Sequence, residues 1–235
     1  MMVDPEVRPS SASPVLEAEK ALLLDLDGVL FDTRVVMCRA WQVVQERHRV
    51  DVAFEDYLRH VGRPFADIME QLGLADAELL HATYDRASLE WGHLAPPFPG
   101  IEAALGAFIQ DGWALGVVTA KPLNRATPLL GRLNCPWGTI RTPGRERGKP
   151  APDPLLLALT ELGVDPAQAV YVGDTAVDQE AARRAGVRYI HAAWGYGTAT
   201  SPQPVTVNDP ASLACLRQSL QTPALSPPIP LRCPQ

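Results

Sequence analysis

The chain is poor in the features that mark several classes of protein. No apolar run approaches the length of a membrane span, and no positively charged start precedes an apolar segment at the N-terminus. Cysteine is scarce: the chain has four cysteines, Cys38, Cys135, Cys215 and Cys233. They form no C-x-x-C pair, which excludes a disulfide framework and a zinc signature. These absences predict a soluble cytoplasmic protein with reduced thiols and no membrane partner.

Basic residues are fewer than acidic ones. The chain has 21 Lys and Arg against 27 Asp and Glu, so its net charge is −6. This balance gives no electrostatic reason to expect nucleic-acid binding. One basic run, at residues 141–149, is interpreted as a solvated loop, because short charge runs usually lie at the surface. The oligomeric state stays open.

Strand-like and helical patterns alternate through most of the chain. This alternation predicts an α/β fold with a doubly wound parallel sheet, in which ligands bind at the carboxyl ends of the strands. The predicted strands are 22–26, 113–119, 139–142, 169–173 and 187–192, and the predicted helices between the later strands are 100–111, 122–133, 152–163 and 175–186.

The interval between residues 34 and 95 differs, because its pattern is helical throughout. A helical insert of this length after the first strand predicts a separate small domain, closed by a stiff Pro-rich return at 93–100. The expected organisation is a loose leader at 1–19, a catalytic core at 20–33 and 96–221, a helical cap at 34–95 and a Pro-rich tail at 222–235.

The first predicted strand ends in two carboxylates, Asp25 and Asp27, followed by Gly28. If the strand continues through both, its period of two sends these side chains the same way. Neighbouring like charges are costly unless a cation or a shared proton stabilises them. The pattern therefore indicates a metal site, an acid/base pair, or a carboxylate nucleophile with its helper.

Other reactive side chains follow later strands. Thr119 ends the second strand, Asp174 follows the strand at 169–173 with Asp178 shortly after it, and Lys149 lies in a Gly-Lys-Pro loop. Each signal is weak alone, since Asp174 and Asp178 could be helix N-terminal acids, Thr119 a cap and Lys149 a surface charge. Their order and placement together are much more specific.

The residues Asp25 to Thr33, DLDGVLFDT, resemble the first motif of the haloacid dehalogenase (HAD) superfamily at every position, and the later sites follow in the order of that superfamily. The resemblance implies a HAD-type Rossmannoid core with a helical cap of the C1 type. It also implies a Mg²⁺-dependent phosphatase that acts on a small phosphorylated metabolite through an aspartyl-phosphate.

The same resemblance implies roles for the matching residues. Asp25 would be the nucleophile, and Asp27 would protonate the leaving alcohol and then activate water. Lys149 would balance the charge of Asp25 and the phosphate. The metal would be held by Asp25, the Asp27 backbone carbonyl and Asp174, with Asp178 binding it directly or from behind.

Thr119 would hold the phosphoryl oxygens together with backbone N–H groups around Gly28 and Ala120. Asp32 and Thr33 are interpreted instead as the start signal of the first cap helix. An aspartate at position 27 favours phosphate esters, because dehalogenases of the superfamily have no alcohol leaving group to protonate.

Within the superfamily, three stretches resemble phosphoglycolate phosphatases and their relatives: 61–65, 119–122 and 193–197. Arg63, in the cap loop, would bind a substrate carboxylate or a second phosphate, or would be a solvent-facing charge. Met37 and Phe65 depart from the mutase pattern, and Ala120 replaces an asparagine common in phosphoglycolate phosphatases. A sugar-phosphate or nucleotide phosphatase, or a retired HAD domain acting as a binding module, remain alternatives.

Overall fold

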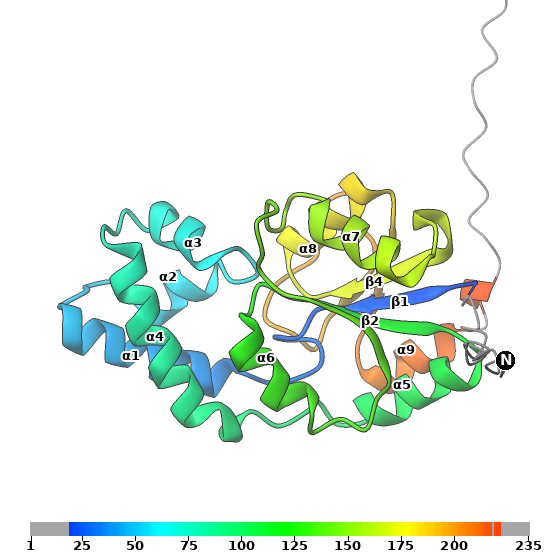
Figure 1. Cartoon of the computed structure of the whole chain (residues 1–235), viewed down its shortest axis with the longest axis horizontal. Helices are drawn as coiled ribbons and strands as arrows, with labels where there is room; N and C mark the ends of the chain where they lie inside the picture. The colour runs from blue at the N-terminus through cyan, green and yellow to red at the C-terminus, as the bar shows by residue number, and fades with distance from the viewer. Residues whose placement is uncertain (1–18, 218, 222–235) are drawn as a thin grey trace, which may run out of the picture.

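The computed structural model describes residues 19–217 and 219–221. Six parallel strands form one sheet in the order β3-β2-β1-β4-β5-β6 (Figure 1). Their bounds are β1 (Ala21–Leu24), β2 (Ala114–Val118), β3 (Trp137–Arg141), β4 (Ala169–Gly173), β5 (Arg188–Ala192) and β6 (Val205–Val207). The predicted α/β fold with a doubly wound parallel sheet is confirmed.

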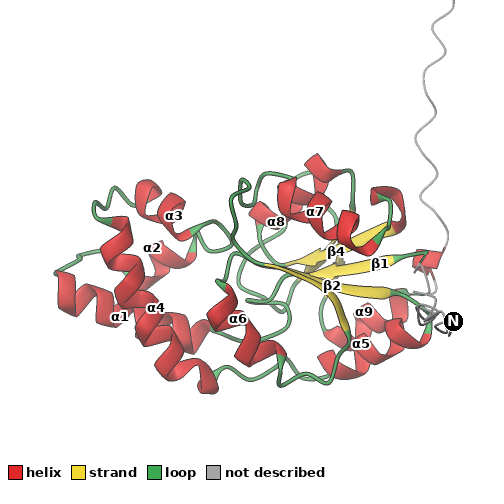
Figure 2. Ribbon diagram, in the orientation of Figure 1, coloured by secondary structure: helices red, strands yellow, loops and turns green. Residues whose placement is uncertain are grey.

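Helices cover both faces of the sheet (Figure 2). One face packs against α5, α6 and α9, and the other against α7 and α8. The bounds are α5 (Ile101–Gln110), α6 (Leu123–Leu130), α7 (Asp153–Leu162), α8 (Ala176–Ala185) and α9 (Pro210–Leu216). Short 3-10 turns, η2 (Pro166–Gln168) and η3 (Ser219–Gln221), complete the core.

The central strand shows why this sequence is buried on both faces. Alternate residues of β1 point to opposite sides, so Leu22 and Leu24 join the cluster beneath α5 while Ala21 and Leu23 join the cluster beneath α7. All four are fully buried, as expected for a strand between two helical layers. Strand β1 pairs with β2 on one side and β4 on the other, which makes it the axis of the site.

Four helices form a second unit beside the core, at the left of Figure 1. They are α1 (Arg34–His48), α2 (Phe54–Leu58), α3 (Phe65–Gln71) and α4 (Ala77–Trp91), followed by the 3-10 turn η1 (Gly92–Leu94). Aromatic side chains hold this unit together; the rings of Trp41 and Tyr57 stack with centroids 4.5 Å apart. Its separate hydrophobic cluster supports the cap at 34–95 that we propose.

The two segments that join cap to core run side by side. Asp32 donates its backbone N–H to the carbonyl of Pro96 at 2.9 Å, and Phe98 donates to the carbonyl of Leu30 at 3.0 Å. These bonds fix the cap's two connections against each other, at the edge of the sheet where β1 ends.

Three sequence expectations need correction or comment. Strand β1 ends at Leu24, two residues before the predicted end, because the chain turns and Leu30 donates back to the Leu26 carbonyl. Strand β6 and helix α9 were not predicted. The predicted tail, and the leader apart from residue 19, lie outside the described residues. None of the helices in the described part has the length and apolar character needed to cross a bilayer.

Candidate active site

The site lies at the carboxyl ends of three neighbouring strands. Asp25 follows β1, Thr119 follows β2 and Asp174 follows β4, and parallel pairing brings these ends to one edge of the sheet. The backbone N–H of Asp25 still donates to the Val172 carbonyl, at 2.9 Å, so this residue is fixed by the sheet. The long loop after β3 brings in Lys149 from the side.

Three carboxylates are buried together there. Asp25, Asp174 and Asp178 each offer an oxygen, and these atoms lie within 4.8 Å of one another. Burial, with the charges of Asp178 and Asp25, raises the pKa of Asp174 well above its ordinary value. Burial likewise raises the pKa of Asp25 to about 7, with Lys149 opposing the rise. Isolated carboxylates would not be held this way without compensating positive charge.

Lys149 supplies one such charge. Its ammonium lies 2.7 Å from Asp178 Oδ1 and 3.2 Å from Asp25 Oδ1, and it donates to the Tyr171 hydroxyl at 3.0 Å. Burial alone would lower the pKa of Lys149, but Asp178 and Asp25 outweigh it and raise the pKa above its ordinary value. The lysine is therefore a buried counter-charge for Asp25 and Asp178, and the surface-charge interpretation is wrong.

The remaining charge fits a divalent cation. With all three carboxylates ionised, one ammonium leaves two net negative charges, which such an ion would neutralise, and the raised pKa values of Asp25 and Asp174 reflect this uncompensated charge together with burial. Asp174 Oδ2 accepts the backbone N–H of Tyr196 at 2.6 Å, whereas its Oδ1 is buried with no hydrogen-bond partner in the described part of the chain. An all-oxygen donor set with one orphaned oxygen is suited to Mg²⁺.

Asp178 is engaged differently from Asp174. Its Oδ1 accepts from Lys149 and from the Tyr171 hydroxyl, while its Oδ2 accepts the N–H and hydroxyl of Thr175 in a capping box at the start of α8. Both oxygens thus have protein donors. The helix-cap interpretation of Asp178 is correct, and it coexists with a place in the carboxylate cluster.

Gly28 allows the loop after β1 to approach Asp174. Its φ is +79°, a conformation that favours glycine, and a Cβ added here would collide with the Asp174 carboxylate. The motif's glycine is thus needed for both backbone shape and space.

Asp27 lies at the rim of this cluster. Its Oδ1 accepts the Thr33 hydroxyl at 2.5 Å and pairs with the Lys121 ammonium at 3.1 Å. The predicted capping role of Thr33 is therefore wrong, since its side chain makes no cap bond and turns to Asp27 instead. Asp32 does accept the N–H of Arg34, at 3.2 Å.

Thr119 and Ala120 lie next to this rim. The Thr119 hydroxyl accepts the backbone N–H of Lys121 at 3.1 Å, and the side chain of Thr119 is buried. A cavity of about 40 Å³ between core and cap is lined by Asp27, Ala120, Lys121 and the half-buried Arg63. Arg63 lies on the cap loop 61–65, where an added Cβ on the core's Gly148 would meet Pro64.

Sequence reasoning assigned no role to Lys121 or Arg125. Both are buried cations at the cap–core interface, and Arg125 pairs with Asp85 of α4 at 2.8 Å and donates to Ser88 at 3.2 Å. A signal for Arg125 did exist, because it lies on the face of α6 whose other buried members include Ala126 and Leu129. A cation on an otherwise apolar helix face predicts a buried ion pair, because a buried charge is costly unless an opposite charge compensates it.

Known proteins resemble this chain over most of its length. The family haloacid dehalogenase-like hydrolase matches residues 19–186. An N-acetylmuramic acid 6-phosphate phosphatase of Pseudomonas aeruginosa is 33% identical over 193 residues, covering 75% of this chain and 83% of the relative. A plasmid-encoded phosphoglycolate phosphatase of Cupriavidus necator is 34% identical over 194 residues, covering 77% and 84%.

Solved structures share the fold. A hydrolase from Pseudomonas syringae superposes with a TM-score of 0.77 at 22% identity, covering 85% of this chain and 98% of its own. CbbY from Rhodobacter sphaeroides in complex with phosphate superposes with a TM-score of 0.70 at 23% identity, covering 83% and 96%. The chain therefore belongs to the haloacid dehalogenase-like hydrolases, as an enzyme of the kind that hydrolyses phosphate esters.

Proposed function

We propose that this enzyme is a Mg²⁺-dependent phosphatase of a small phosphorylated metabolite that acts through a phosphorylated Asp25. The observation that carries the proposal is the buried carboxylate cluster with one ammonium and an orphaned Asp174 oxygen. Asp25, Asp174 and the Asp27 backbone carbonyl would hold the ion. Asp178 supports the site from behind, since its oxygens already have donors.

Phosphoryl transfer requires a nucleophile in line with the leaving group and neutralisation of the equatorial oxygens. A bound Mg²⁺ would supply positive charge to the phosphoryl oxygens and reduce their repulsion from the nucleophile. Asp25 then attacks phosphorus, and Lys149 balances the charge beside it. The Thr119 hydroxyl and the backbone N–H of Ala120 hold the phosphoryl oxygens. The N–H of Gly28, expected to join them, instead donates to the Phe31 carbonyl at 3.0 Å.

Asp27 transfers the proton in both half-reactions. One of its oxygens, Oδ1, is occupied by Thr33 and Lys121, so its other oxygen is the one left to face the leaving alcohol. It protonates that alcohol as the bond to phosphorus breaks. It then accepts a proton from the water that hydrolyses phospho-Asp25.

The first substrate to test is 2-phosphoglycolate, the substrate named for several relatives of this chain. Arg63 is the cation proposed to bind its carboxylate, because it lines the cavity that contains Asp27. A sugar phosphate is the second candidate, favoured by the N-acetylmuramic acid 6-phosphate relative; a nucleotide is the third. We further propose that the enzyme acts in the cytoplasm on a small molecule and does not bind nucleic acid.

The test is phosphate release from a panel of these esters, with Mg²⁺ and with EDTA. We expect metal-dependent turnover that Asp25→Asn abolishes. Asp165→Asn, an exposed aspartate in the turn before η2, is the matched control and retains full activity. Absence of turnover by folded, Mg²⁺-loaded enzyme would support the retired binding module instead.

A further inference from the structure

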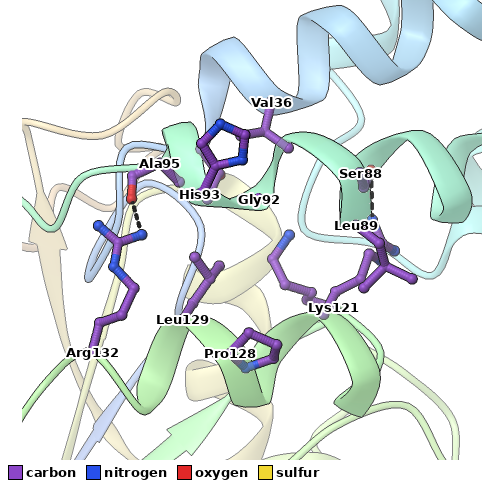
Figure 3. A pocket seen from close by; sticks show the side chains of 12 residues that line it. Val36, Ser88, Leu89, Gly92, His93, Ala95, Lys121, Pro128, Leu129 and Arg132 are labelled. Carbon is purple, nitrogen blue, oxygen red and sulfur yellow. Dashed lines mark hydrogen bonds between the residues drawn. The ribbon is translucent and has the colours of Figure 1, made fainter.

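A second and much larger cavity, the hinge pocket, opens between α6 of the core and the end of α4 with η1 (Figure 3). It measures about 290 Å³, against about 40 Å³ for the cavity that contains Asp27. Small-molecule sites usually start near ~300 Å³. The smaller cavity is far below this size, so a leaving alcohol as large as a sugar needs the additional space of the hinge pocket.

The hinge pocket adjoins the reaction centre. Lys121 and Arg125 line both cavities. Thr33 lines the hinge pocket and donates its hydroxyl to Asp27, the proposed general acid. Lys121 and Arg125 thus form a wall common to the two cavities, and an alcohol that receives its proton from Asp27 enters the hinge pocket past Lys121.

The lining of the hinge pocket combines an apolar floor with positive charge. Pro128 and Leu129 of α6 lie below, and Val36 of α1 lies opposite (Figure 3). No carboxylate belongs to the lining, while Lys121 and Arg132 bring cations to it. This chemistry favours an anionic organic molecule.

Arg132 is the cation best placed to receive that anion. Lys121 is already paired with Asp27, and Arg125 with Asp85. Arg132 donates to the backbone carbonyl of Ala95 and lies over the Phe31 ring, and within the described part of the chain it forms no ion pair with a carboxylate. Its guanidinium can therefore bind a ligand carboxylate.

The position of Arg132 sets the length of the ligand. Figure 3 shows Lys121 and Arg132 at opposite ends of the pocket, with Pro128 and Leu129 between them. Arg125 lies in the first turn of α6, whereas Arg132 lies in the turn that follows the end of this helix at Leu130. Since Arg132 lines the hinge pocket and Asp27 lines the other cavity, a ligand that contacts both residues needs a longer chain than a two-carbon acid, and a sugar-sized acid is the class to test.

We propose that the hinge pocket holds the alcohol part of the substrate, and that the preferred substrate is the phosphate ester of a sugar-sized carboxylic acid whose carboxylate pairs with Arg132. This proposal rests on the phosphatase function proposed above and names its substrate class.

The first test compares kcat/KM of the wild type for three esters. They are 6-phosphogluconate (a sugar-sized acid), glucose 6-phosphate (similar in size but neutral apart from its phosphate) and 2-phosphoglycolate (an acid too short to fill the pocket). We expect 6-phosphogluconate to be the best, by tenfold or more over 2-phosphoglycolate and by about two- to fivefold over glucose 6-phosphate, the range for an exposed ion pair. A preference for 2-phosphoglycolate would overturn the substrate class and leave the phosphatase proposal intact.

The second test fills the hinge pocket. Gly92 lines it in a helical conformation, with no atom within 4 Å of an added Cβ, so Gly92→Phe adds a ring without backbone strain. We expect kcat/KM for 6-phosphogluconate to fall at least tenfold more than for 2-phosphoglycolate. Gly106→Phe is the matched control, because Gly106 of α5 also has open space and lies outside the pocket.

The third test removes the proposed carboxylate partner. Arg132→Gln should raise KM for 6-phosphogluconate about two- to fivefold, the range for an exposed ion pair, without a matching change for glucose 6-phosphate. Equal effects on the two esters would show that Arg132 does not read the carboxylate.

Binding separates failure of this proposal from failure of the phosphatase function. If no ester is hydrolysed, the phosphatase proposal fails, and calorimetry of 6-phosphogluconate with Mg²⁺-loaded Asp25→Asn protein still tests the pocket. Binding that Gly92→Phe weakens at least tenfold in that background supports the hinge pocket. Binding that it leaves unchanged, or no binding at all, overturns the proposal.

Discussion

Replacing Lys149 by methionine removes the ammonium that lies between the buried carboxylates of Asp25 and Asp178 while keeping the approximate length of the side chain. The Lys149 side chain is 2% exposed, and its partners Asp25 and Asp178 are 4% and 0% exposed. Removing one partner of a buried ion pair costs about 3–5 kcal/mol, because the other charge stays buried without compensation. At about 2–4 °C per kcal/mol for a chain of this size, we expect the melting temperature to fall by roughly 6–20 °C.

The assays are thermal unfolding for the melting temperature and denaturant unfolding for the free energy, both in EDTA, which keeps bound metal from masking the lost charge. Arg147→Met is the matched control from the same loop, since Arg147 is 78% exposed in its pair with Asp153. An exposed pair contributes about 0–1 kcal/mol. In the double variant Lys149→Met with Asp178→Asn, the loss should be smaller than the sum of the single losses. A Lys149→Met protein as stable as the Arg147→Met control would refute the reasoning.

Three further predictions concern the acid, the metal and the cap. Asp27→Asn should slow the hydrolysis of alkyl phosphate esters about 10²–10⁴-fold. It should leave the first burst of phenolate release from an aryl phosphate unchanged, as measured by stopped flow. Gly28→Ala should weaken Mg²⁺ binding in calorimetry at least about tenfold through its contact with Asp174, whereas Gly186→Ala, equally left-handed but uncrowded, should not. Arg125→Leu should lower unfolding stability by about 1–3 kcal/mol, against no measurable loss for the exposed Arg59→Leu.

The sequence predicted the sheet and the edge at which the site forms, because these depend on local patterns. Buried strands read as apolar runs, and a carboxylate or threonine directly after such a run lies at the carboxyl end of a parallel sheet. Asp25, Thr119 and Asp174 were all placed in this way. Strand β6 was missed because it has three residues, two of them exposed, and so lacks an apolar run. Helix α9, which follows β6, was missed with it.

Contacts between distant segments were beyond local patterns. Thr33 has the residue type and position of a helix cap, yet its hydroxyl turns to Asp27, which the chain brings close by turning after β1. The prediction that a strand's period of two sends Asp25 and Asp27 the same way does not apply, because β1 ends before both residues. Arg125 and Asp85 meet only because the cap packs on α6.

The measurement that tests the central claim most directly is capture of phosphate on Asp25. Mg²⁺-loaded Asp27→Asn enzyme, which lacks the base for the second half-reaction, is mixed with a labelled aryl phosphate, quenched in acid within milliseconds and digested for mass spectrometry. We predict label on the peptide from Ala21 to Arg34, localised to Asp25 and absent when Asp25→Asn is added. Phenolate release with no label on this peptide, or label on another residue, would contradict the account.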